Sequence, residues 1–208
     1  MEKNRFNYRT LEEMKKDIQH LEIDCPVDED LQVLLAEKKI GEQVVPNSLA
    51  IHPMEGSDSK DDGAPSDLTL RRYRRYAEGG AGLIWFEAIS VNETGRANKN
   101  QLYLNEKTVD PIKDMVRMVR ERAQKTSGEG FNPYLVSQLT HSGRFGENRH
   151  LLFHQDFVDK AAGIKKDRPI MTDEELEELE DDFLIAAKLA QRAGFDAVDI
   201  KACHRYLL

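Results

Sequence analysis

Cysteine is scarce in this sequence, and long apolar runs are missing from it. Its 208 residues include only two cysteines, Cys25 and Cys203, which cannot form a disulfide framework or a four-thiolate metal site. No apolar stretch approaches the roughly 20 residues that a membrane-spanning helix needs. No apolar segment follows the first charged residues, so a secretory signal is not expected. We therefore expect a cytoplasmic protein that has no membrane partner.

Positive charge is also in the minority. The sequence has 30 Lys and Arg against 38 Asp and Glu, which gives a formal net charge of -8. Nucleic acids favour partners with clustered positive charge, so no nucleic-acid partner is expected. The basic run at residues 71–76 does not change this, because Leu70, Tyr73 and Ala77 have helical spacing and should face a core. Its arginines are expected to form a solvated helix face.

Apolar strands alternate with amphipathic helices from Val44 onward. Three helices are expected: one capped by Ser66 or Asp67, one over residues 105–124, and a long acidic one that Thr172 caps and Gly194 ends. The expected strands cover residues 47–54, 82–88, 133–139 and 197–200. Consecutive strand–helix–strand units of this kind predict a parallel α/β sheet.

Each of these strands ends in conspicuous, mostly polar residues, at 52–55, 87–88, 138–141 and 201–206. Right-handed crossovers bring the carboxyl ends of parallel strands to one edge. This favours a (β/α)8 TIM barrel, of which the chain supplies about the first four β/α units. An open doubly wound sheet would need a G-x-G-x-x-G turn, which residues 53–56 do not supply. Residues 1–40 are expected to form an N-terminal extension, and residues 41–208 the N-terminal half of the barrel.

Reactive side chains are most concentrated after the last strand. Lys201 and His204 can donate hydrogen bonds to an oxyanion, and Tyr206 can deliver a proton. A lysine at a strand end can alternatively form a Schiff base with a carbonyl substrate, and ordinary loop residues remain a third interpretation. Cys203 is expected to be a small packing residue, since free cysteines are usually buried and inert.

Two further polar features are weaker signals. Gln138 brings amide donors and an acceptor to the same edge of the sheet. His150 and His154 are four residues apart, and His141 precedes them, but no convincing further ligand accompanies them. No metal site is expected, because zinc requires a set of ligands in a defined geometry.

With these residues placed, the chain resembles the old yellow enzyme family of NAD(P)H-linked FMN oxidoreductases from about Gly41 to Leu208. Five ordered motifs carry the resemblance: Asn47-x5-Pro53-Met54, residues 75–84 (RYAEGGAGLI), Glu87-Ala88, Gln138-Leu139-x-His141-x-Gly143-Arg144, and residues 193–200 (AGFDAVDI). Five motifs in order and at compatible spacings make a specific match.

The resemblance implies a role for each candidate residue. The implied cofactor-binding residues are Pro53, Met54, Glu55, Ala88 and Gln138, and Gln138 would bond the pyrimidine edge of FMN. The family's pair that binds the carbonyl oxygen falls on Lys201 and His204, and its proton-donating tyrosine falls on Tyr206. The implied reaction transfers hydride from NAD(P)H through FMN to the β-carbon of an α,β-unsaturated carbonyl compound, a small-molecule substrate.

The sequence departs from the family pattern in three residues and in length. Lys201 replaces a histidine, which suggests an anionic substrate or a different oxygen geometry. Glu55 replaces a small Thr or Cys and should disfavour an anionic reduced flavin, and Arg205 replaces a common Gly. Family barrels have eight strands, with the phosphate site after strands seven and eight. The alternative is therefore a truncated, catalytically inactive half-barrel that acts as a fragment or assembly module, for example as a homo-oligomer.

Overall fold

The structure, a computed structural model, describes residues 7–208, which fall into two units that divide between Leu34 and Leu35. In the first unit, helix α1 (Leu11–His20) begins at Thr10, whose hydroxyl accepts the Glu13 backbone N–H at 3.3 Å. None of the α1 residues is buried. The short helix α2 (Gln32–Leu35) follows.

The second unit is built on a parallel sheet whose strands lie in sequence order. The strands are β3 (Ala50–Ile51), β4 (Leu83–Ser90), β5 (Tyr134–Thr140) and β6 (Ala197–Ile200). A small antiparallel hairpin, β1 (Lys38–Ile40) and β2 (Gln43–Val45), precedes them. The predicted parallel sheet is confirmed, and β6 has the predicted bounds.

The first strand of the sheet is much shorter than the predicted residues 47–54. At its start, Asn47 makes side-chain hydrogen bonds to the turn before β4. Its side-chain oxygen accepts the Gly82 N–H at 2.7 Å, and its amide nitrogen donates to the Gly80 carbonyl at 2.8 Å. At the other end Pro53 has no N–H to donate to a neighbouring strand. Only Ala50 and Ile51 remain in register with β4.

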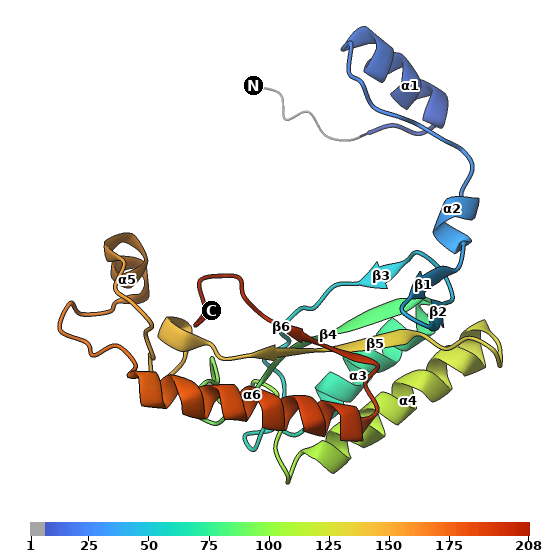
Figure 1. The fold of residues 1–208 in the computed structure, drawn as a ribbon. Helices are drawn as coiled ribbons and strands as arrows, with labels where there is room; N and C mark the ends of the chain where they lie inside the picture. Colours follow the sequence, from blue (N-terminus) through green and yellow to red (C-terminus); the bar gives the residue numbers. More distant parts are fainter. Residues whose placement is uncertain (1–6) are drawn as a thin grey trace. The chain divides into compact units, whose positions relative to one another are not determined.

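Three helices cover one face of this sheet: α3 (Asp67–Glu78), α4 (Val109–Ser127) and α6 (Asp173–Ala193) (Figure 1). Each connects two successive parallel strands. Helices on a single face are the arrangement of a barrel wall, whereas a doubly wound sheet has helices on both faces. The observed layers therefore agree with the predicted barrel and not with its open rival.

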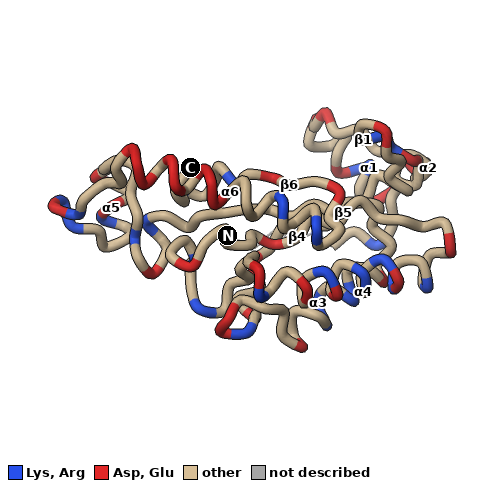
Figure 2. Tube along the Cα trace, turned by 60° about the horizontal axis from the view of Figure 1, so that its bottom comes forward, with Lys and Arg blue, Asp and Glu red and all other residues tan. Residues whose placement is uncertain are grey.

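The helix ends follow the sequence signals closely, with one exception. Ser66 and Thr172 form capping boxes at the starts of α3 and α6, and Gly194 ends α6 in a left-handed conformation. Acidic residues gather along the first half of α6 (Figure 2). Helix α4 begins at Val109, later than predicted, because the Asn105 side chain accepts backbone N–H groups of the preceding turn.

The apolar core lies between the helices and the sheet. The predicted inward residues of α4 are all buried: Val109, Ile112, Met115, Val116 and Val119. On the sheet side, the Phe86 ring stacks on Tyr73 of α3 with ring centroids 4.2 Å apart. No helix within residues 7–208 is long and apolar enough to span a membrane.

A segment with little apolar patterning separates β5 from α6. It contains the 3-10 turn η1 (Gly143–Phe145) and helix α5 (Asp156–Ala162), neither of which was predicted. Arg144, only 5% exposed, pairs with Asp159, and Asp159 also accepts a 2.8 Å hydrogen bond from His154. This buried ion pair joins η1 to α5.

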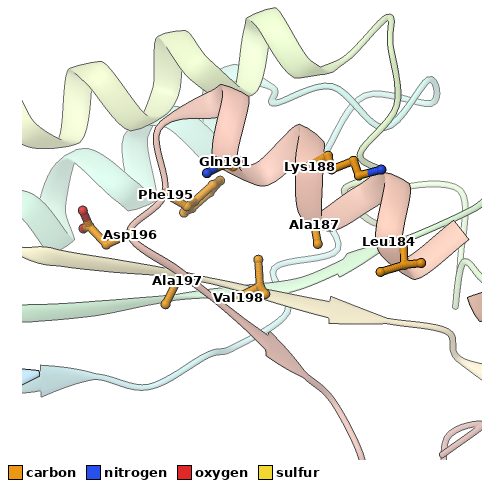
Figure 3. A pocket seen from close by; sticks show the side chains of 8 residues that line it. All are labelled: Leu184, Ala187, Lys188, Gln191, Phe195, Asp196, Ala197 and Val198. Carbon is orange, nitrogen blue, oxygen red and sulfur yellow. The ribbon is translucent and has the colours of Figure 1, made fainter. Parts of the chain in front are cut away.

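The sheet is open at β6, which pairs with β5 alone among the described strands. Val198 and Ile200 on this strand are 41% and 45% exposed. A groove of about 350 Å³ lies between β6 and α6, and Figure 3 shows Val198 pointing toward Leu184 and Ala187 of the helix. An open apolar edge of this kind can accept a further strand and helix.

Candidate active site

One pocket of about 460 Å³ lies at the carboxyl edge of the sheet. Its lining combines residues that are distant in the sequence: Pro53, Met54, Glu55, Gln138, Lys201, Cys203, His204 and Tyr206. Three segments supply them, namely the loop after β3, strand β5 and the loop after β6. Seven of the eight predicted site residues are therefore neighbours in this structure.

Ala88 is the predicted residue that does not line the pocket. It lies inside β4, is 1% exposed, and pairs in register with Gln138 of β5. Glu87 and Ala88 were expected at the end of their strand, but β4 continues to Ser90. A register shift between Trp85 and Ala88 rotates this part of the strand.

Glu55, Lys201 and Tyr206 form a triangle of mutual contacts within the pocket. The Glu55 Oε1 atom lies 2.7 Å from Lys201 Nζ and accepts a 3.2 Å hydrogen bond from the Tyr206 hydroxyl. Lys201 Nζ also lies 4.1 Å from the centre of the Tyr206 ring. One carboxylate oxygen thus contacts two of the three residues that were predicted to act on the substrate.

Tyr206 has an altered acidity in this environment. Burial, followed by the charge and hydrogen bond of Glu55, raises the pKa of Tyr206 to about 12. Both causes act against the phenolate, since a nearby carboxylate and a low dielectric disfavour a second negative charge. The Tyr206 hydroxyl therefore keeps its proton across the neutral range.

Gln138 is oriented by a neighbour on the next strand. Its Nε2 atom donates a 2.7 Å hydrogen bond to Asp199 Oδ2 of β6, and the residue is 8% exposed. Because the amide nitrogen is directed to Asp199, the amide oxygen of Gln138 is left to accept a hydrogen bond in the pocket. Asp199 was not singled out from the sequence.

Cys203 was expected to be a buried packing residue, and this expectation is wrong. Its thiol is exposed, and Sγ lies 3.1 Å from Nδ1 of His204. The chain turns away from the strand here, with φ of 60° at His204 and 59° at Arg205. Glycine adopts this left-handed region without strain, which is consistent with the Gly that the family commonly has at the position of Arg205.

The segment that carries Tyr206 is attached to the loop after β5. The Leu207 N–H donates to the His141 carbonyl at 3.2 Å, and the Leu207 side chain is 4% exposed. A Cβ at Gly143 would lie 2.7 Å from Leu207 Cα, so this close approach needs glycine. His141 itself is buried, and burial followed by the proximity of His150 lowers its pKa to about 4.

A second charged cluster lies behind the pocket, and the sequence did not reveal it. Arg72 Nη2 lies 2.7 Å from Glu87 Oε1 and 2.8 Å from Asp58 Oδ1, and Glu87 is 1% exposed. The other Glu87 oxygen accepts the Gly56 N–H at 3.0 Å. Arg72 was expected on a solvated face, but its guanidinium lies inward because two carboxylates face it.

This cluster fixes the backbone next to Glu55. Burial raises the pKa of Glu87, while the Arg72 guanidinium opposes that shift. The Glu87 N–H donates to the Tyr73 hydroxyl at 2.8 Å.

Within residues 7–208, no group of three or more His, Cys, Asp or Glu side chains has a metal-binding arrangement.

Comparison with known proteins identifies the relatives of this chain. The family model described as NADH:flavin oxidoreductase / NADH oxidase matches residues 36–208. The chain belongs to this family. Its members bind FMN and use NAD(P)H as the reductant.

Individual relatives agree with this assignment. The chain is 31% identical to an NADPH dehydrogenase of Listeria monocytogenes over 180 residues, which cover 84% of the chain and 49% of the relative. It is 30% identical to an NADH:flavin oxidoreductase of Gibberella zeae over 173 residues, or 78% of the chain and 42% of the relative. The chain thus spans about half the length of the curated relatives that it matches.

Solved structures confirm the fold. The old yellow enzyme from Pichia sp. AKU4542 superposes with a TM-score of 0.70 at 23% identity, over 84% of this chain and 47% of that one. Morphinone reductase gives a TM-score of 0.68 at 22% identity, with coverages of 84% and 49%. The described sheet and helices therefore correspond to about half of a TIM barrel.

Proposed function

We propose that the protein is an FMN-dependent oxidoreductase that uses NAD(P)H to reduce the C=C bond of an α,β-unsaturated carbonyl compound. In this proposal residues 41–208 provide about the first four β/α units of the barrel. The observation that carries it is the single pocket, into which three separate segments bring seven of the predicted residues. Glu55 and Lys201, which are 146 positions apart, are in direct contact at this edge.

The pocket has the chemistry that a flavin ring requires. Pro53 and Met54 offer apolar surface, with Met54 70% exposed, and the Gln138 amide oxygen can accept a hydrogen bond from a polar ring edge. The lysine of the pocket is paired with Glu55, so the described lining suits the ring system and provides no free cation for a phosphate. Pro53, Met54 and Gln138 would thus hold the ring of FMN.

Bound FMN would supply the hydride, taken from NAD(P)H, that the β-carbon receives. The protein's own part is to bind the carbonyl oxygen and to provide the proton. His204 and Lys201, which both line the pocket, would donate hydrogen bonds to that oxygen and stabilise the negative charge that develops on it. Tyr206, with its raised pKa, holds the proton for the α-carbon.

The decisive variant is Tyr206→Phe. Loss of a positioned general acid typically slows the step it serves by about 10²–10⁴-fold. Stopped-flow absorbance should therefore show slower reduction of cyclohex-2-enone, while reduction of the flavin by NAD(P)H keeps nearly its full rate. Tyr134→Phe is the matched control, since Tyr134 lies at the start of β5, away from the pocket. Equal enone reduction by Tyr206→Phe and the parent protein, or a protein that takes up no FMN, would overturn the proposal.

The open edge at β6 favours a second candidate function. Val198 and Ile200 are exposed on a strand that has one described partner, next to an apolar groove. A chain with this surface could act as an assembly module that pairs with another copy or chain and has no activity of its own. Light scattering after gel filtration distinguishes the two, because self-association without FMN uptake supports the assembly role.

A further inference from the structure

The ion pair between Glu55 and Lys201 is not explained by carbonyl binding. Their side chains are 20% and 6% exposed, and they come from loops after different strands. A buried charge pair is expensive to desolvate and is weak evidence for stability alone. Its place in the pocket, in contact with the proposed proton donor, points to a role in the site itself.

The position of Glu55 is set from behind by the second cluster. The N–H of the next residue, Gly56, donates to Glu87, and Arg72 binds Glu87 in turn. A Cβ at Gly56 would collide with the Arg72 guanidinium, so the loop and the cluster are in close contact. The backbone that carries the Glu55 carboxylate is therefore fixed before any ligand enters.

We propose that Glu55 is a positioning residue of this site: its carboxylate neutralises the Lys201 ammonium and holds the Tyr206 hydroxyl, so that the site rejects carboxylate ligands that an unpaired lysine would attract. The selectivity part of this inference rests on the proposed function. The replacement of histidine by Lys201 was expected to mean either an anionic substrate or a different geometry of hydrogen bonding to the substrate oxygen. The pairing of Lys201 with Glu55 favours the second of these.

The electrostatics of the triangle lead to this selectivity. An ammonium has three donors, and Glu55 uses one of them, which leaves hydrogens for an uncharged carbonyl oxygen. A carboxylate ligand at the same place would meet the like charge of Glu55 within a few ångströms. Lys201 and Glu55 together carry no net charge, so the attraction that a lone lysine would exert is cancelled.

The same triangle predicts how Tyr206 responds when Glu55 loses its charge. The titratable groups that face its ring and hydroxyl are Glu55, Lys201, Cys203 and His204. In Glu55→Gln the carboxylate no longer opposes the phenolate, while the Lys201 ammonium stays 4.1 Å from the ring and favours it. The pKa of Tyr206 should therefore fall from about 12 toward its ordinary value of about 10.

This response can be measured without FMN or NAD(P)H. Ultraviolet absorbance of tyrosinate is followed against pH in the parent protein and in Glu55→Gln, and the spectra of the matching Tyr206→Phe proteins are subtracted. Glu129→Gln, a change of the same kind at an exposed loop glutamate, is the control and should leave the titration unchanged. Circular dichroism at each pH confirms that the protein is folded. An unchanged Tyr206 titration in Glu55→Gln would refute the positioning role.

Acetate is the probe for the selectivity. Calorimetry should show acetate binding to Glu55→Gln roughly tenfold or more tightly than to the parent protein, because one charge-assisted hydrogen bond becomes available. The double variant Glu55→Gln with Lys201→Met should lose that gain. Equal acetate affinity in the parent protein and Glu55→Gln would overturn the selectivity. Failure of FMN uptake, in contrast, would refute the proposed function and leave both of these results interpretable.

Discussion

Two charged clusters, one behind the pocket and one in it, contain the same three kinds of group in different settings. Behind the pocket, Glu87 contacts Arg72 and Tyr73, and in the pocket Glu55 contacts Lys201 and Tyr206. The first glutamate is 1% exposed, whereas the Glu55 side chain is 20% exposed. The difference shows that a Glu–cation–Tyr group has a structural role where it is buried, as in the cluster of Arg72, Tyr73 and Glu87, called the sealed cluster below. Such a group is available to ligands where it faces a pocket.

The choice of cation follows the same division. Arginine presents a rigid fork, and Arg72 uses it to bind Glu87 and Asp58 together. Lysine is a point charge with three rotatable donors, so Lys201 can bind Glu55 and still offer hydrogens to a ligand. The fixed Arg72–Glu87 cluster thus supports the more adaptable Glu55–Lys201 pair. The connection between them is the hydrogen bond from the Gly56 N–H to Glu87.

The largest effect is expected from breaking the sealed cluster. Arg72→Met leaves Glu87 buried without its cation, and removal of one partner of a buried ion pair costs about 3–5 kcal/mol of unfolding free energy. Urea denaturation measures this loss. Arg71→Met, an exposed position on the same helix, should change the free energy of unfolding by about 0.5 kcal/mol or less. Similar losses in the two variants would show that the sealed cluster has no structural role.

A smaller effect is expected from the connection between the clusters. In Gly56→Ala the new Cβ would lie 2.5 Å from Arg72 Cζ and 2.8 Å from Asp58 Oδ1, and such overpacking costs about 1–3 kcal/mol. The shift of the loop should also change the Tyr206 titration, although Tyr206 is not altered. Gly130→Ala is the control, since nothing lies within 4 Å of a Cβ there. A destabilised Gly56→Ala protein with the parent titration would show that the two clusters are independent.

The sequence predicted the parts of the fold that depend on local pattern. The capping box of Thr172 and Glu175, the end of α6 at Gly194, and the bounds of β6 all follow from neighbouring residues. The convergence of the pocket residues followed from one physical rule, that parallel strands present their carboxyl ends at one edge.

What the sequence could not predict depends on side-chain partners far along the chain. Lys201 and Glu55 are 146 residues apart, and nothing local to either indicates the other. Arg72 lies among arginines that are exposed, and only the carboxylates of Asp58 and Glu87 distinguish it. The exposure of Cys203 follows from the left-handed turn at His204, a conformation that non-glycine residues seldom adopt.

The smallest effect is expected in the stability of the protein at alkaline pH. It tests the cluster of Glu55, Lys201 and Tyr206 in the pocket. The folded-state pKa of Tyr206, about 12, lies above the unfolded value of about 10, so the folded state binds more protons between these pH values. The free energy of unfolding should therefore be unaffected by Tyr206 below about pH 10 and should fall as pH rises toward 12. Urea denaturation at pH 9, 10 and 11 should show a shallower decline for Tyr206→Phe than for Tyr134→Phe. Parallel declines would mean that Glu55 and burial do not hold the proton on Tyr206.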